Sequence, residues 1–164
     1  MESNVYKALE LLLRQSEFSQ RKFFHRNNHN GNTVSGGSHL LAEWCTVGIR
    51  CARRSGHTTA IFQIIDNYFS GESIIYCGHN MSQSIMMRQD WDRDFNNPNV
   101  DLKFATISNL NNSLRDLKSI PVAVFLDCAS IVDIEEKKAL SIVESLASRV
   151  VFEKKEPFFY VKVQ

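Results

Sequence analysis

Two short segments of the 164-residue chain hold residue types that suit the binding of a phosphate group. A phosphate-binding loop of the form Gly-x-x-x-x-Gly-Lys-Ser/Thr lies between a strand and a helix, where its backbone N–H groups cradle phosphates and its hydroxyl holds Mg²⁺. In the first segment, residues 51–59, Gly56 and Thr58 match the second glycine and the hydroxyl residue of this form. Cys51 stands in place of its first glycine, and His57 in place of its lysine. The segment therefore has the frame of such a loop without its lysine.

The second segment is an apolar run, Val122–Leu126, that ends in Asp127. A buried strand that ends in an aspartate can hold Mg²⁺ beside a phosphate-binding loop. An acidic residue beside this aspartate ordinarily polarises the attacking water, but here Cys128 follows Asp127.

These two segments resemble the P-loop NTPases, in particular those of the helicase and terminase type. By order of elements the resemblance covers residues 43–152, and motif identity is carried by Gly56, Thr58 and Asp127. It implies that ATP and Mg²⁺ are the ligands, with Mg²⁺ held at Thr58 and Asp127. The nucleotide-binding residues that the resemblance implies are Gly56, His57, Thr58, Thr59 and Asp127.

The departures from the motif set the expected activity. Histidine is shorter than lysine and mostly neutral at pH 7, so His57 does not supply the fixed positive charge on the phosphates. With no acidic neighbour of Asp127, we expect weak or absent ATP hydrolysis, while nucleotide binding is retained. The alternative is an ordinary strand-to-helix turn capped by Ser55 or Thr58, in a non-catalytic protein that uses the P-loop scaffold to bind a host protein complex or DNA. The compact size and divergent loop suit a bacteriophage protein.

A cluster of basic residues lies in the same loop. Arg50, Arg53 and Arg54 fall in a stretch with no acidic residue between Glu43 and Asp66. Guanidinium groups make bidentate contacts with phosphates of a nucleotide or a nucleic acid. The alternative is a solvated loop, which the near-neutral net charge of +1 also allows. His79, which follows a second apolar run, is a weaker candidate for the same site because ligands bind at the carboxyl ends of parallel strands.

The elements that must position these residues alternate along the chain. Such alternation predicts an α/β three-layer domain with a mainly parallel sheet. The last two apolar runs flank the polar turn 154–157, which predicts a hairpin and an antiparallel edge. Strands are expected at 43–50, 73–77, 100–107, 122–127, 150–152 and 158–163, and helices at 60–65, 80–95, 111–117 and 135–149.

The N-terminal part of the chain reads as a separate element. Apolar residues at helical spacing over 4–24 predict an amphipathic helix, and an Asn-, Gly- and Ser-rich loop follows it. We therefore divide the chain into a helix at 1–26, a flexible loop at 27–38 and the α/β domain at 39–164. The helix packs its apolar stripe on the domain or, alternatively, docks a partner through its basic and aromatic residues.

Composition bounds the class of protein. Hydrophobic residues make up 43% of the chain and charged residues 23%, which excludes an intrinsically disordered protein. The four cysteines form no Cys-x-x-Cys pair and lie in or beside apolar runs, so we expect free thiols in a reducing cytoplasm. No basic leader precedes an apolar stretch, and no uncharged run reaches the length of a membrane span.

Overall fold

The sheet at the centre of the molecule has five strands, and every pair of neighbours in it is parallel. The computed structural model describes residues 3–27, 41–51, 56–115, 117–127 and 133–163. Across the sheet the strands follow the order β1-β5-β4-β2-β3. Their bounds are Thr46–Ile49 (β1), Ser73–Gly78 (β2), Asp101–Thr106 (β3), Ala123–Asp127 (β4) and Phe159–Val163 (β5).

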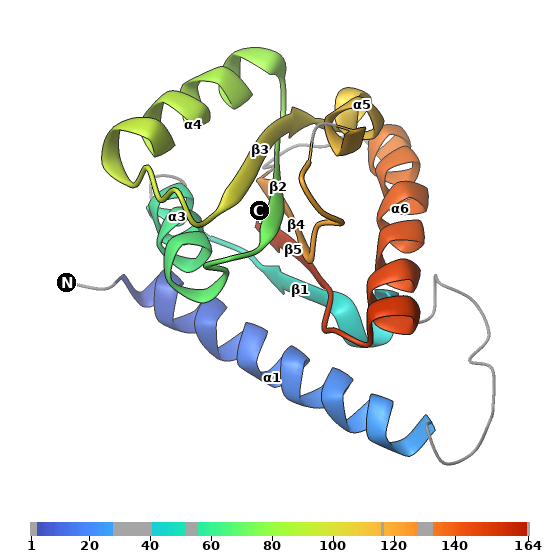
Figure 1. The fold of residues 1–164 in the computed structure, drawn as a ribbon. Coiled ribbons are helices and arrows are strands. Elements are labelled where there is room, and N and C mark those ends of the chain that lie inside the picture. The colour runs from blue at the N-terminus through green and yellow to red at the C-terminus, as the bar shows by residue number, and fades with distance from the viewer. Residues whose placement is uncertain (1–2, 28–40, 52–55, 116, 128–132, 164) are drawn as a thin grey trace.

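Helices cover both faces of this sheet, which makes three layers (Figure 1). Helices α1, α3 and α4 lie on one face, where α1 packs against α3, and α5 and α6 lie on the other. The helices are α1 (Asn4–Asn27), α3 (His57–Tyr68), α4 (Met81–Asp94), α5 (Leu110–Arg115) and α6 (Asp133–Ser148). Three short helical turns join them, namely η1 (Leu41–Cys45), η2 (Ile107–Asn109) and η3 (Arg149–Lys154).

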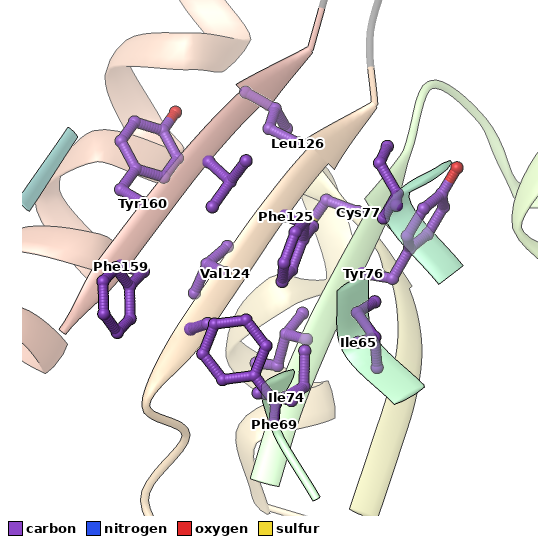
Figure 2. Packing of buried hydrophobic residues seen from close by; sticks show 14 of the residues in the cluster. Ile65, Phe69, Ile74, Tyr76, Cys77, Val124, Phe125, Leu126, Phe159 and Tyr160 are labelled. Carbon is purple, nitrogen blue, oxygen red and sulfur yellow. The ribbon is translucent and has the colours of Figure 1, made fainter. Parts of the chain in front are cut away.

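The central strands β2 and β4 are mostly apolar because helices cover both of their faces. Every residue of β2 and β4 is buried. Aromatic rings fill the space between the sheet and α3: Phe69 packs edge-on against Phe125 of β4 and Phe159 of β5, and Phe62 packs against Tyr76 of β2 (Figure 2). This packing holds α3 against the sheet.

The path of the chain defines where a ligand is expected in such a sheet. From β1 the chain passes through α3 to β2 and through α4 to β3, and then returns through α5 to β4 and through α6 to β5. The outgoing helices and the returning helices lie on opposite faces (Figure 1). The connection that leaves β2 and the connection that leaves the neighbouring strand β4 run in opposite directions across the sheet. Open α/β sheets bind ligands beyond the carboxyl ends of the strands at such a point.

The C-terminal hairpin expected from the sequence is wrong. Residues 149–154 form η3, which continues α6, and only residues 159–163 form a strand. That strand is parallel and lies between β1 and β4 instead of at an antiparallel edge. Val150 and Val151 are buried as part of a helical turn, so their apolar character reflects burial and not strand formation.

The N-terminal helix α1 packs on the domain. Leu9 and Leu13 are fully buried, and Gln20 is buried with them. The Ser16 hydroxyl donates a hydrogen bond of 2.7 Å to the Trp44 carbonyl, just before β1. The apolar stripe of α1 therefore forms part of the core of the molecule. Within the described residues, none of the helices has the length and apolar character needed to cross a membrane.

Candidate functional site

Helix α3 begins at the carboxyl edge of the sheet with a glycine in an unusual conformation. Gly56, the residue before the helix, has φ 74° and ψ 23°, in the left-handed region. An added Cβ would meet no atom within 4 Å, so glycine is needed here for backbone conformation and not for space. No side chain of the described residues caps the helix. Among the described residues, no side chain therefore accepts from the first N–H groups of α3.

Asp127, the last residue of β4, receives side chains from two other elements. The Thr58 hydroxyl in the first turn of α3 donates a hydrogen bond of 3.1 Å to Asp127 Oδ2, although the two residues are 69 positions apart. The Tyr76 hydroxyl of β2 donates to the same oxygen. His57 Nε2 lies 3.2 Å from the other oxygen, Oδ1. One carboxylate therefore ties the start of α3 to the ends of β2 and β4.

Burial makes this carboxylate sensitive to its partners. The Asp127 side chain is 4% exposed and the His57 side chain 29% exposed. A buried carboxylate is stable only when its oxygens accept hydrogen bonds, and here both oxygens have a partner. His57 Nδ1 is buried and has no hydrogen-bond partner among the described residues. The pair Asp127–His57 thus presents one unpaired ring nitrogen at the start of α3.

The strand register places the last residue of β1 at the same level of the sheet as Asp127. Ile49 of β1 and Asp127 of β4 are both paired with Val163 of the strand between them. Arg50 follows Ile49 directly and is exposed. Arg50 therefore lies at the carboxyl edge of the sheet, and the backbones of β1 and β4 are two strand spacings, or about 10 Å, apart there.

The structure brings together some of the residues expected from the sequence and leaves others apart. His57, Thr58 and Asp127 form one cluster that Gly56 adjoins. Thr59 is exposed and makes no hydrogen bond with this cluster. Arg53, Arg54 and Cys128 lie outside the described residues.

His79 does not join the cluster. It is exposed, and its backbone N–H donates a hydrogen bond of 2.6 Å to the side chain of Gln83. This residue helps to start α4, and its side chain forms no hydrogen bond or ion pair with the cluster in the part of the chain that the structure describes.

Tyr76 is the residue of this site that sequence reasoning did not identify. It lies in the apolar run of β2 and reads as a core residue, and its ring does pack against Phe62 and Phe104. A buried tyrosine hydroxyl nevertheless needs a hydrogen-bond partner. A tyrosine two residues before the carboxyl end of a central strand was therefore a signal that a polar group lies at that end.

The cluster offers ligands for a hard cation in only one place. Thr58 and Asp127 contribute two oxygens that are 3.1 Å apart, and Mg²⁺ prefers oxygen ligands. Among the described residues there is no group of three or more His, Cys, Asp or Glu side chains that could hold a metal ion without other ligands. A cation here would depend on phosphate and water oxygens for its remaining ligands, as Mg²⁺ commonly does.

Comparison with known proteins gives no family for this chain. The sequence matches no protein-family model, and no curated protein matches it.

Proposed function

We propose that the carboxyl edge of the sheet at α3 and β4 is a degenerate P-loop-like site that binds nucleotide phosphates with weak or no hydrolysis. The observation that carries this proposal is the hydrogen bond between Thr58 and Asp127. It joins the hydroxyl at the start of a helix to the aspartate at the end of a buried strand, which are the two positions expected to share Mg²⁺ in a P-loop site.

Three further observations support phosphate binding at this place. Helix α3 has 12 residues and no side-chain cap among the described residues, so its N-terminus offers N–H groups and a partial positive charge to an anion. The site lies where the outgoing and returning connections part. Arg50 adds an exposed positive charge at the same edge.

The metal is assigned to the same pair of side chains. Thr58 and Asp127 would hold Mg²⁺, which would supply positive charge to neutralise the phosphates. The residues of the chain itself would orient the phosphates through the first turn of α3, and His57 would hold the Asp127 carboxylate from its other oxygen.

Weak hydrolysis follows from the same geometry. His57 takes the position of the P-loop lysine, but its Nε2 is directed at Asp127 and not toward open space beyond the helix. No acidic side chain of the described residues contacts Asp127 to act as a base for water. The site therefore supports binding better than turnover.

A second candidate function is favoured because both carboxylate oxygens of Asp127 already have partners within the protein. Its two oxygens already have Thr58, Tyr76 and His57 as partners, so the fold is complete without a cation. In this alternative the P-loop-like scaffold serves a non-catalytic binding protein, such as a bacteriophage protein that engages a host protein complex or DNA. Arg50 would then contact a nucleic-acid backbone or an acidic protein surface.

Thermal unfolding with and without Mg-ATP separates these candidates. If Mg-ATP binds, a concentration tenfold above the Kd stabilises the protein by about 1.4 kcal/mol, or about 3–6 °C in Tm. We expect this shift to disappear in Thr58→Val, which removes the hydroxyl but keeps the branched shape, and to persist in Thr58→Ser. Asp127→Asn should reduce it as well.

The variant His57→Lys tests the assignment of the fold. A lysine at this position should increase the affinity for Mg-ATP if the start of α3 is a P-loop that has lost its lysine. No thermal shift at millimolar Mg-ATP in either the natural protein or His57→Lys contradicts nucleotide binding. Salt-sensitive binding to DNA that is lost in Arg50→Ala would then support the second candidate.

A further inference from the structure

The outer side of β3 is an unpaired strand edge with a hollow beside it. In the described sheet β3 pairs only with β2, so its other side faces no strand. A cavity of about 480 Å³ lies there, which is within the range of sites that hold a ligand. Its lining includes Arg88 and Trp91 of α4, Lys103 and Phe104 of β3, and Ser113 of α5. Because α4 and α5 lie on opposite faces of the sheet, this hollow runs across the strand edge (Figure 1).

The direction of the backbone N–H and C=O groups along β3 shows which of its residues can form hydrogen bonds with an added strand. The Asp101 N–H donates a hydrogen bond of 3.0 Å to the Glu72 carbonyl, so the backbone of Asp101 is turned toward β2. Successive residues of a strand direct their N–H and C=O groups to alternate sides. The groups of Leu102 and Phe104 are therefore turned outward, toward the hollow. An extended chain laid beside them would pair with both residues in a regular ladder.

Beside these groups lies the positive charge of Lys103, which has no ion-pair partner among the described residues. Phe104 packs on Phe62 of α3, so the Lys103 side chain lies on the opposite face, toward α5. Lys103 forms no hydrogen bond or ion pair with any described residue. Asp101, two residues away on the same face, instead accepts from the Ser73 hydroxyl and the Lys118 backbone N–H.

The charges of the neighbouring helix do not neutralise Lys103 either. Arg88 and Asp92 of α4 form an exposed ion pair with each other, with 3.8 Å between Arg88 Nε and Asp92 Oδ2. Within the described residues, Lys103 therefore lies unpaired between the two outward-facing residues, Leu102 and Phe104.

This charge discriminates between two occupants of the edge. If a second copy of the chain paired antiparallel through Leu102 and Phe104, its own Lys103 would lie directly opposite Lys103, and like charges in that position are destabilising. Lysine on a strand edge is a common means of blocking such self-pairing. An acidic side chain at the same position would instead be attracted to Lys103.

We propose that the free edge of β3 binds an extended segment of a partner protein, which adds a sixth strand and places an acidic side chain opposite Lys103. The outward N–H and C=O groups of Leu102 and Phe104 supply main-chain hydrogen bonds, the hollow between α4 and α5 accommodates the added chain, and Lys103 selects its charge. This interaction surface is separate from the cluster at Asp127.

Two synthetic peptides of the same length test this proposal. One has the sequence Thr-Val-Glu-Val-Thr with blocked ends, and the other has Lys in place of Glu. Each is titrated to millimolar concentration into the ¹⁵N-labelled full chain, and amide hydrogen exchange is followed by NMR. We expect the Glu peptide to slow exchange of the Leu102 and Phe104 amides, while the amides of Lys103 and Ala105, which already face β2, change little.

Two variants make the result specific. Lys103→Glu reverses the charge of a half-buried side chain and should invert the preference between the two peptides by about fivefold. Leu102→Pro removes one outward N–H that the sheet does not use, a substitution that strand edges tolerate, and should abolish protection. Circular dichroism confirms that each variant is folded.

The proposal is overturned if neither peptide protects the Leu102 and Phe104 amides, or if both bind equally to the natural chain and to Lys103→Glu. Sedimentation that reveals a dimer lost in Leu102→Pro would also overturn it, because the edge would then be occupied by a second copy.

Discussion

The side-chain amide of Gln20 in α1 pairs with the backbone of Phe158, immediately before β5. Its Nε2 donates to the Phe158 carbonyl over 2.8 Å, and its Oε1 accepts from the Phe158 N–H over 2.9 Å. All of these groups are buried, and the two residues are 138 positions apart. A single side chain therefore joins the N-terminal helix to the last strand of the sheet.

Gln20→Ala should lower the free energy of unfolding by about 3 kcal/mol, because it leaves a buried N–H and a buried carbonyl without partners. Urea unfolding measures this loss. Gln15→Ala, at an exposed position of the same helix, serves as the control and should change stability by no more than about 0.5 kcal/mol. Equal effects of the two substitutions would mean that α1 is not held by Gln20.

Thr58 and Thr59 provide a matched pair for the cluster at Asp127. Thr58→Val removes a hydrogen bond to a buried carboxylate and should destabilise the protein by about 1.5–2 kcal/mol. Thr59→Val removes an exposed hydroxyl and should have an effect within about 0.5 kcal/mol. Valine and threonine have similar helix propensity, so the difference in unfolding free energy between the two variants isolates the bond to Asp127.

Tyr76→Phe should destabilise the protein by about 1–3 kcal/mol, because the ring keeps its packing while Asp127 loses a buried donor. Thr58 and Tyr76 donate to the same oxygen, so their effects should not add. The measurement is a double-mutant cycle with Thr58→Val. A coupling energy below about 0.3 kcal/mol would contradict a shared acceptor.

Thiol reactivity should distinguish the buried cysteines from Cys51. Burial raises the pKa of Cys45 and of Cys77 to about 12, so almost none of either is thiolate at neutral pH. Cys51 is only half-buried. In a Cys128→Ser background, which leaves three of the four cysteines, a disulfide reagent at pH 7 should modify one thiol rapidly and the other two only after unfolding. Rapid modification of all three would contradict the burial of Cys45 and Cys77.

Glu17 should contribute to the loss of stability in acid. Burial alone raises the pKa of its carboxyl, but hydrogen bonds from Tyr68 and Arg21 outweigh burial and leave this pKa below its ordinary value. A carboxyl with a lowered pKa in the folded state stabilises the protein above its unfolded pKa, and this contribution is lost as the pH falls through the folded pKa. Glu17→Gln should therefore flatten the stability curve as the pH falls from about 5 to 3. Unfolding in urea at several pH values measures the slope, and Tyr68→Phe should flatten it in the same direction.

The sequence was informative where a local pattern and the tertiary structure agree. The apolar run that ends in Asp127 became β4, and the run at 73–77 became β2, because strands buried on both faces need continuous apolar residues. The helix expected at 135–149 also has its counterpart in α6. The start of α3 could be located because glycine and threonine mark the start of a helix after a strand.

Other features depend on long-range packing that no local pattern reveals. Val150, Val151 and Phe152 have the composition of a strand, but they extend α6 as a helical turn, and β5 is the strand that pairs with β4. In α4 the exposed Met81 is apolar, whereas the buried face includes Ser84, whose hydroxyl donates to the carbonyl of Ala105. Tyr76 belongs to the cluster because β2 lies beside β4 in the sheet, and the spacing of residues along the chain does not reveal this neighbourhood.

The interior position of β5, between β1 and β4, also constrains the order in which the molecule can form. β1 pairs with no other strand of the described sheet, so it has no place there until residues 159–163 have been synthesised. On the ribosome, β2, β3 and β4 can associate first, while β1 can pair only after β5 has left the exit tunnel. Closure of the sheet therefore brings together segments more than 100 residues apart, and such long loops slow folding. The edge that contains Asp127 and the start of α3 is complete only after that final step.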